Sequence, residues 1–382
     1  MSARGGGGGG GSATLTFRGG GWVILLAGLL VLAVLVWSLL GPLLGRRPVG
    51  DGRTLASYGF DLSNLKVATE ELVPSGNPRG FLPSLDHPKH LAGRDMAVFN
   101  ERNRPKYVVT SDRVAGIVVN GQPHAWPLSL LNVHEVVNDE IGGVPVAATY
   151  SPLCDSLVVF DRRVGGMARL FEVSGLLVDS NLVFYDKAVD GAGAGRGTPH
   201  VPSLFLQLER RAIAGPLAAE GGTDLAILPG ASITTWADWL AAHPTTTVAE
   251  RDPDMVRRMK EISYARYFLT PRLEFPADPM PDEATMKASG LRLKSPILAI
   301  HGASGWKLLA IEPLSAAAGA DRTARIAIDG AELNVYLPPG PAVARAERVD
   351  GTPVEVIPCL YFAAEALLQS GEFAAMIPSK ER

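Results

Sequence analysis

The longest apolar segment of the chain runs from Trp22 to Leu40, nineteen residues in which Ser38 is the only polar side chain. A helix of about 20 apolar residues matches the roughly 30 Å hydrocarbon core of a bilayer. Trp22 and Trp37 lie near its two ends, where indole rings favour the membrane interface. The pattern predicts a transmembrane helix over residues 21–45, with the lipid bilayer as its partner through residues 22–40.

A cleaved signal peptide is the alternative interpretation of this segment. Such peptides have an apolar region of about 7–15 residues followed by a small-residue cleavage site. Here the run is longer and is followed by G-P-L-L-G-R-R-P, which favours an uncleaved anchor. Two arginines precede the helix and three follow it, a count that favours a cytoplasmic C-terminal region. Because long folded domains translocate largely regardless of flanking charge, we expect a single-pass membrane protein with its domain outside the cytoplasm.

Beyond Tyr58 the apolar positions form short β-branched runs separated by turn signals. Asn-Gly and Gly-Gly pairs supply the positive φ that tight hairpins require. They predict turns at Asn120-Gly121, Gly142-Gly143 and Gly165-Gly166. The runs predict strands at Val114–Val119, Val144–Tyr150, Leu157–Phe160, Leu182–Tyr185 and Leu225–Leu228. The expected fold class is therefore mainly β (α+β), with one N-terminal transmembrane helix followed by a β-rich domain.

Two helices interrupt the β pattern. Thr234-Thr235 can cap W-A-D-W-L-A-A-H, and Asp252 can open a second helix that runs towards Arg266. A Pro-rich linker at 270–290 follows and predicts a domain boundary. The expected division is a disordered Gly-rich tail (1–20), the transmembrane helix (21–45), a main β-rich domain (55–269), the linker, and a C-terminal β unit plus helix (291–382).

The β pattern after the linker resembles the pattern before it. P-I-L-A-I-H-G precedes a Trp-bearing segment, as A-G-I-V-V-N-G does earlier, and Asp329-Gly330 and Asp350-Gly351 supply turn signals at comparable spacing. These features are consistent with a decayed internal repeat covering about Val114–Val173 and Ser295–Ile357. Chance is the equal alternative, because Gly-containing turns are common in any β protein.

Composition limits the classes of function. The chain has 382 residues, 47% of them hydrophobic and 20% charged, and a net charge of -3. It can bury a substantial core, and it has no concentrated positive face of the kind that binds nucleic acid. Protein partners do not follow from the sequence.

The densest cluster of polar residues within an apolar stretch is L-L-N-V-H-E-V-V-N-D, from Leu130 to Asp139. His134-Glu135 invites comparison with the zinc motif H-E-x-x-H, but Asn138 occupies the position of the second His, so that interpretation fails. A His and a carboxylate remain, able to act as acid and base or to supply one metal ligand each. A hydrogen-bonded structural His is the more common outcome.

The segment S-P-L-C-D-S follows a predicted strand and contains Cys154, one of only two cysteines. A thiol at a strand end, near a His of the same β unit, is a candidate nucleophile or soft metal ligand. The alternative is an inert buried cysteine. Cys359 is the only intrachain disulfide partner, and we expect it to lie in the core instead, because it begins an apolar helix pattern.

Residues 60–243 resemble domain-of-unknown-function family 3179 of bacterial proteins. The matching motifs are D-L-S-N-L, D-H-P-K, N-G-Q-P-H-A-W-P-L, L-N-V-H-E-V-V-N-D-E-I-G-G-V-P-V, T-Y-S-P-L-C, V-F-D-R-R, V-S-G-L-L, S-N-L-V-F-Y-D, A-G-P-L-A and T-T-W-A-D-W. The family is typically exported or membrane-anchored, which implies the outward orientation. Its usual T-Y-C-P-L-C-G loop implies a metal or redox site. Here Ser151 replaces the first Cys, Asp155 replaces the Gly, and Phe205 replaces the Trp of S-L-W-S-Q.

Three hypotheses follow, in order of preference. The domain is a non-catalytic binding or scaffolding module with a degenerate site. Alternatively, it holds a transition metal through His134 and Cys154, with Glu135 or Asp155 as a further ligand. In the third hypothesis it is an enzyme in which Cys154 is the nucleophile and His134 the base, oriented by Glu135 or Asp139.

Overall fold

The computed structural model describes residues 21–43, 48–188, 200–219, 223–340 and 342–368. The predicted Gly-rich tail, residues 1–20, lies outside them. Two units are distinguished, Met1–Pro48 and Val49–Arg382. The first contains α1 (Gly21–Leu43), whose side chains are described from 22 to 38 and are exposed there. Within the described part of the chain, no helix is both long and apolar enough to cross a membrane.

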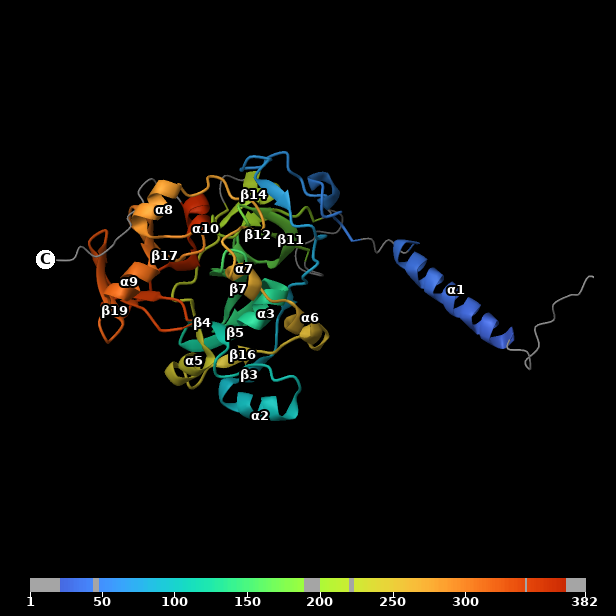
Figure 1. Ribbon diagram of the computed structural model, residues 1–382, viewed down its shortest axis with the longest axis horizontal. Coiled ribbons are helices and arrows are strands. Elements are labelled where there is room, and N and C mark those ends of the chain that lie inside the picture. The colour runs from blue at the N-terminus through green and yellow to red at the C-terminus, as the bar shows by residue number, and fades with distance from the viewer. Residues whose placement is uncertain (1–20, 44–47, 189–199, 220–222, 341, 369–382) are drawn as a thin grey trace, which may run out of the picture. The chain divides into compact units, whose positions relative to one another are not determined.

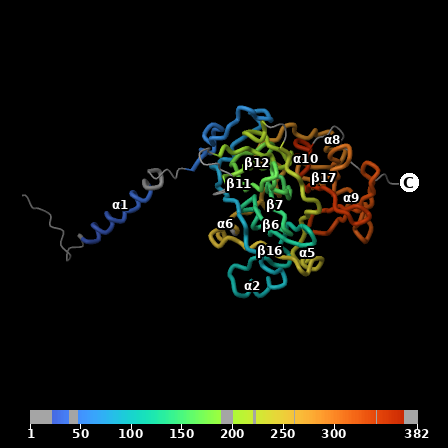
Figure 2. The backbone as a smooth tube through the Cα atoms, turned by 180° about the vertical axis from the view of Figure 1, so that it is seen from behind, coloured from blue at the N-terminus to red at the C-terminus, as the bar shows by residue number. Residues whose placement is uncertain are grey.

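Three β-sheets are stacked in the second unit (Figures 1 and 2). One outer sheet has the order β1 (Leu72–Pro74), β11 (Leu170–Val178), β12 (Asn181–Lys187), β13 (Leu204–Leu206) and β14 (Arg211–Ala214). The central sheet has the order β2 (Leu85–Asp86), β6 (Val136–Ile141), β7 (Val144–Ser151) and β8 (Ser156–Asp161). The other outer sheet has the order β15 (Ser232–Thr235), β4 (Arg113–Val119), β5 (Gln122–Pro127), β16 (Thr247–Ala249) and β3 (His90–Ala92).

The central sheet is buried on both faces, which explains its continuous apolar runs. Ala147 and Phe160 pack into the core shared with β11 and β12. Val146 and Ala148 point the opposite way and pack into the core shared with β4 and β5. Successive side chains of a strand alternate between faces, so one strand supplies both cores.

A further pair of sheets and several helices complete this unit. The C-terminal sheets are β18 (Gly305–Ala310)–β17 (Pro296–Gly302)–β22 (Val356–Leu360) and β19 (Thr323–Ile328)–β20 (Ala331–Tyr336)–β21 (Arg345–Arg348), and a short ribbon pairs β9 (Arg163–Val164) with β10 (Met167–Ala168). The helices are α2 (Met96–Arg102), α3 (Leu128–His134), α4 (Pro216–Ala219), α5 (Trp236–Ala242), α6 (Val256–Glu261), α7 (Ala265–Phe268), α8 (Glu283–Ser289), α9 (Ile311–Ala317) and α10 (Tyr361–Leu367). Single 3-10 turns lie at Leu55–Tyr58, Gly93–Asp95 and Pro253–Met255.

The structure confirms the predicted hairpins. Asn120 and Gly121 both have positive φ, 48° and 75°, and join β4 to β5. Gly142-Gly143 joins β6 to β7 in the same way, and Gly165-Gly166 joins β9 to β10. The predicted strand at Leu225–Leu228 is wrong, because it forms only an isolated bridge between Ile227 and Phe160.

The predicted helix at Trp236 is confirmed, because the Thr235 side chain accepts a hydrogen bond from the Asp238 N–H. The second predicted helix is interrupted. It consists of the turn at Pro253–Met255, then α6, then α7. Ile262 takes an extended backbone, and the Ser263 hydroxyl accepts from the Ala265 N–H where α7 begins.

The same order of elements occurs twice. A hairpin, a seven-residue helix and three antiparallel strands occur as β4–β5–α3–β6–β7–β8 and again as β17–β18–α9–β19–β20–β21. A later strand then pairs with the first strand of each hairpin, β15 with β4 and β22 with β17. Each of these strands leads into a seven-residue helix, α5 or α10. The segment 270–290, the predicted linker, contains α8.

Candidate functional site

The S-P-L-C-D-S segment forms the tight connection from β7 to β8. Ser151 pairs with Ser156 across its base, and the Cys154 N–H donates to the Ser151 carbonyl at 3.2 Å. Asp155 has a φ of 44°, a conformation that Gly adopts freely and Asp tolerates better than most residues. The Asp155 carboxylate accepts hydrogen bonds from Arg113 at 3.0 Å and from the Tyr150 hydroxyl at 2.6 Å.

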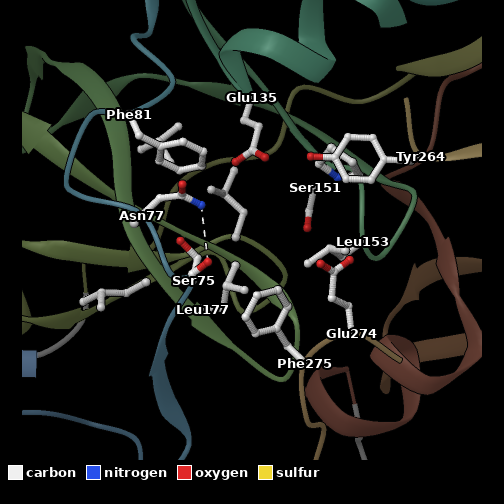
Figure 3. A pocket seen from close by; sticks show the side chains of 15 residues that line it. Ser75, Asn77, Phe81, Glu135, Ser151, Leu153, Leu177, Tyr264, Glu274 and Phe275 are labelled. Atoms are coloured by element: carbon white, nitrogen blue, oxygen red, sulfur yellow. Dashed lines mark hydrogen bonds between the residues drawn. The ribbon is translucent and has the colours of Figure 1, made fainter. Parts of the chain in front are cut away.

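A cavity of about 140 Å³ lies beside this loop (Figure 3). Its apolar lining comes mainly from the β11–β12 hairpin, the β7–β8 loop and two phenylalanines: Val173, Leu176, Leu177, Leu182, Leu153, Phe81 and Phe275. Its polar lining is Ser75, Asn77, Glu135, Ser151, Tyr264 and Glu274. The site therefore joins an apolar floor to a small number of polar groups, as small-molecule sites do.

Glu135 enters this cavity from the end of α3. It is the C-terminal cap of that helix, with a left-handed φ of 53°, and its N–H donates to the Leu131 carbonyl. Burial raises the pKa of its carboxyl group to about 8. The Tyr264 hydroxyl points toward the Glu135 carboxyl group (Figure 3), and burial, followed by the charge of Glu135, raises the pKa of Tyr264. A non-glycine residue held at positive φ is a strained position of the kind found at functional sites.

Two further features of the lining indicate a binding role. The Ser75 hydroxyl is buried and has no hydrogen-bond partner in the described part of the chain. Such an orphan polar atom costs free energy unless a ligand or water satisfies it. Among the described residues of the lining, Glu135 and Glu274 are the only ones with a carboxyl group, and none is basic.

Cys154 is part of this loop, and its side chain is fully buried. Its thiol donates a hydrogen bond to the Ser180 carbonyl at 3.4 Å, and its own carbonyl accepts from the Leu360 N–H at 2.9 Å. Burial raises the pKa of the Cys154 thiol to about 12, so the sulfur is protonated at neutral pH. Cys154 and Cys359 are both free thiols. A protonated, enclosed thiol is a poor nucleophile.

The structure gives His134 a different neighbourhood from that of Cys154. Its Nδ1 lies 2.6 Å from the Pro83 carbonyl oxygen, and its buried Nε2 has no hydrogen-bond partner among the residues that the structure describes. Burial lowers the pKa of His134, which keeps the imidazole neutral. Among the described residues, one group of three side chains can bring metal-binding atoms together, and neither His134 nor Cys154 belongs to it. Their joint role as a metal pair or a catalytic pair stays a prediction.

Sequence reasoning identified Glu135 and the loop but not their partners in the cavity. Tyr264 lies just before α7 and Glu274 follows it, far along the chain from α3. Ser75 and Asn77 follow β1. No local motif marks any of these four residues, so only the folded arrangement reveals them.

The comparisons with known proteins give a family and no function. Residues 79–304 match the model of the family described as "Protein of unknown function (DUF3179)". The match covers more than half of the chain, and the protein belongs to that family. No curated protein and no solved structure matches it.

Proposed function

We propose that the chain is a membrane-anchored, non-catalytic binding module whose cavity takes a small molecule with a protonated amine on an apolar body. The observation that carries this proposal is the acidic character of the lining: among its described residues, Glu135 and Glu274 are the only ionisable side chains apart from Tyr264. A buried carboxylate favours a cationic partner, and a charge-assisted hydrogen bond between them is stronger than a neutral one.

The size and floor of the cavity define the rest of the ligand. An apolar cavity of about 150 Å³ accommodates benzene, and the volume here is about 140 Å³. Leucine, valine and phenylalanine side chains form its floor, and these favour a hydrocarbon group. The amine would then lie at the polar side, within reach of the carboxyl groups and of the unpaired Ser75 hydroxyl.

A non-catalytic role is supported by the departures of this chain from the usual loop of its family. Ser151 lines the cavity at the position where the first Cys would be, so the polar wall has a hydroxyl in place of a reactive thiol. The remaining Cys154 is enclosed and protonated. Binding without chemistry requires neither a nucleophile nor a paired thiol site.

The anchoring part of the proposal rests on α1 and its sequence. Apolar side chains from Trp22 to Trp37 are exposed, Ile24 at 72% and Trp37 at 82%. Exposed apolar surface of this extent favours transfer into lipid. We place the folded unit outside the cytoplasm, as expected for this family. In inverted membrane vesicles, added protease should then leave the unit intact; its digestion would instead place the unit in the cytoplasm.

The ligand class is tested with three aromatic probes of similar shape and different charge. Benzylamine, benzyl alcohol and benzoate are titrated into the full-length chain in detergent, with ligand-observed NMR as the readout. The amine should bind best, the alcohol more weakly, and benzoate least. Equal binding of all three, or preference for benzoate, would contradict the proposal.

A further inference from the structure

A second polar cluster lies away from the lining of the cavity, between the central sheet and the sheet that contains β4 and β5. It consists of His90 on β3, His124 on β5 and Asp139 on β6. One ligand atom from each side chain lies within 4.8 Å of the others. Asp139 and Val137 are two positions apart on β6, so Asp139 points toward the core that contains Trp126.

Strand register brings the two histidines to one face of the sheet. β16 lies between β5 and β3, with Thr247 opposite His124 and Ala249 opposite His90. Residues two positions apart on a strand share a face, so both imidazoles project to the same side. Their ring centroids are 4.3 Å apart.

The hydrogen bonds of this cluster leave one buried nitrogen atom without a partner. Nε2 of His90 lies 2.7 Å from Oδ1 of Asp139, which is a hydrogen-bond distance. Nε2 of His124 is 3.4 Å from Oδ2 of the same carboxylate but makes no hydrogen bond there. His124 is fully buried, so water cannot satisfy this atom from outside. An imidazole nitrogen that faces a carboxylate at this distance is stabilised by a cation or a proton between the two.

Neighbouring groups orient two of the three side chains, His124 and Asp139, as the surroundings of metal ligands do. The Nδ1 of His124 lies 2.7 Å from the Thr247 hydroxyl, which leaves Nε2 to face the cluster. Trp126 donates its indole N–H to Oδ2 of Asp139 at 3.0 Å, and the Glu140 N–H donates to Oδ1 at 2.8 Å. Such outer hydrogen bonds fix the tautomer of a ligating His and the orientation of a ligating carboxylate.

We propose that Nε2 of His90, Nε2 of His124 and the carboxylate of Asp139 bind a divalent transition-metal ion. Two imidazole nitrogens and one carboxylate oxygen suit zinc or iron(II) better than the all-oxygen sites of calcium and magnesium. The ion takes the place of the proton shared by His90 and Asp139, which is released to solvent. The His90 side chain is 30% exposed, so the ion has a route from the surface.

A purely structural hydrogen-bond network is the competing explanation, and the duplicated topology weighs against it. His124 is three residues before the end of β5, and Lys307 holds that position in β18. Asp139 is two residues before the end of β6, and Ile326 holds that position in β19. The second copy forms the same hairpin, helix and strands without the cluster, so this topology does not require it.

The test uses the full-length chain, stripped with a chelator and titrated separately with Zn²⁺ and, under anaerobic conditions, Fe²⁺. Metal content and thermal unfolding are measured for the native chain and for His90→Asn and Asp139→Asn. His87→Asn is the matched control, because His87 is exposed, lies three positions away and is outside the cluster. Cys154→Ala tests the alternative that the thiol is a ligand.

The native chain should bind one ion and unfold at a higher temperature with it. His90→Asn and Asp139→Asn should weaken binding by roughly a hundredfold or more and abolish that shift. His87→Asn and Cys154→Ala should bind as the native chain does. If Asp139→Asn fails to fold, the His90→Asn variant alone decides the test, because His90 is partly exposed. Absence of stoichiometric binding of both ions, or full retention in His90→Asn, would show that the cluster is a hydrogen-bond network only.

Discussion

Arg113 and Asp155 form a close ion pair in which Nη2 of Arg113 lies 3.0 Å from each carboxylate oxygen. Their side chains are 24% and 19% exposed, so the pair is largely removed from solvent. Asp155 has a φ of 44°, a conformation that Gly adopts freely. The loop therefore combines a backbone conformation that favours Gly with a carboxylate that accepts hydrogen bonds from Arg113 and Tyr150.

Glycine at this position should destabilise the protein. Asp155→Gly relaxes the backbone but leaves Arg113 and the Tyr150 hydroxyl without their shared acceptor. We expect the free energy of unfolding to fall by about 1–3 kcal/mol, measured by chemical denaturation. Asp155→Asn, which keeps an acceptor and tolerates the positive φ, should lose less. A glycine variant as stable as the native chain would show that the ion pair contributes nothing net.

The two thiols should be unreactive in the folded protein. Burial raises the pKa of Cys154 to about 12 and raises that of Cys359, so neither forms a thiolate at neutral pH. Iodoacetamide should modify them only on the timescale of unfolding, monitored by mass spectrometry with denatured protein as the control. Rapid labelling of Cys154 in the folded chain would instead support the Cys154–His134 enzyme hypothesis.

The carboxyl group of Glu135 should make stability depend on pH. Its pKa is raised from 4.5 to about 8 on folding, so the folded state binds the proton more tightly than the unfolded state. The stabilisation that Glu135 contributes to the folded state is therefore complete below its ordinary carboxyl pKa and is lost as pH rises through about 8. Glu135→Gln should remove a decrease of more than about 1 kcal/mol over that window. Parallel pH profiles for the two proteins would contradict this assignment.

The proposed membrane anchoring should depend on the apolar character of α1. Replacing Leu30 and Val34 together by Arg costs about 3 kcal/mol for each charge at the centre of a membrane helix. The full-length variant should leave the membrane fraction on an alkaline wash, whereas the native chain stays. Replacing the same two residues by Phe keeps the segment apolar and should leave it in the membrane. Release of the native chain by the wash would contradict an embedded helix.

Features that depend on neighbouring residues could be predicted from the sequence. Asn120-Gly121 forms a hairpin because both positions adopt positive φ. Thr235 starts α5 because its hydroxyl reaches the Asp238 N–H three residues on. No comparable local pattern in the sequence predicts the interruption between α6 and α7.

The candidate sites depend on approaches between distant segments, which local patterns do not encode. Glu135 was identified, but Tyr264 lies just before α7, in a segment with no motif of its own. His124 belongs to the motif N-G-Q-P-H-A-W-P-L, which was identified from the sequence. His90 lies beside it only because β16 pairs with both β5 and β3. His134 and Cys154 were expected to meet because they lie in the same β unit. His134 Nδ1 lies 2.6 Å from the Pro83 carbonyl oxygen, and its pairing with Cys154 stays a prediction.

The most direct test of the proposed function is calorimetric titration of the full-length chain with benzylamine, repeated for Glu135→Gln. The native chain should bind one amine per cavity, with affinity that increases as pH rises through about 8, where Glu135 ionises. Glu135→Gln should bind at least about tenfold more weakly and lose that pH dependence, since a charge-assisted hydrogen bond is worth about 1.5–3 kcal/mol. Glu101→Gln, at an exposed glutamate of α2, should bind as the native chain does. Equal affinity of the native and Glu135→Gln proteins would contradict an amine site at this cavity.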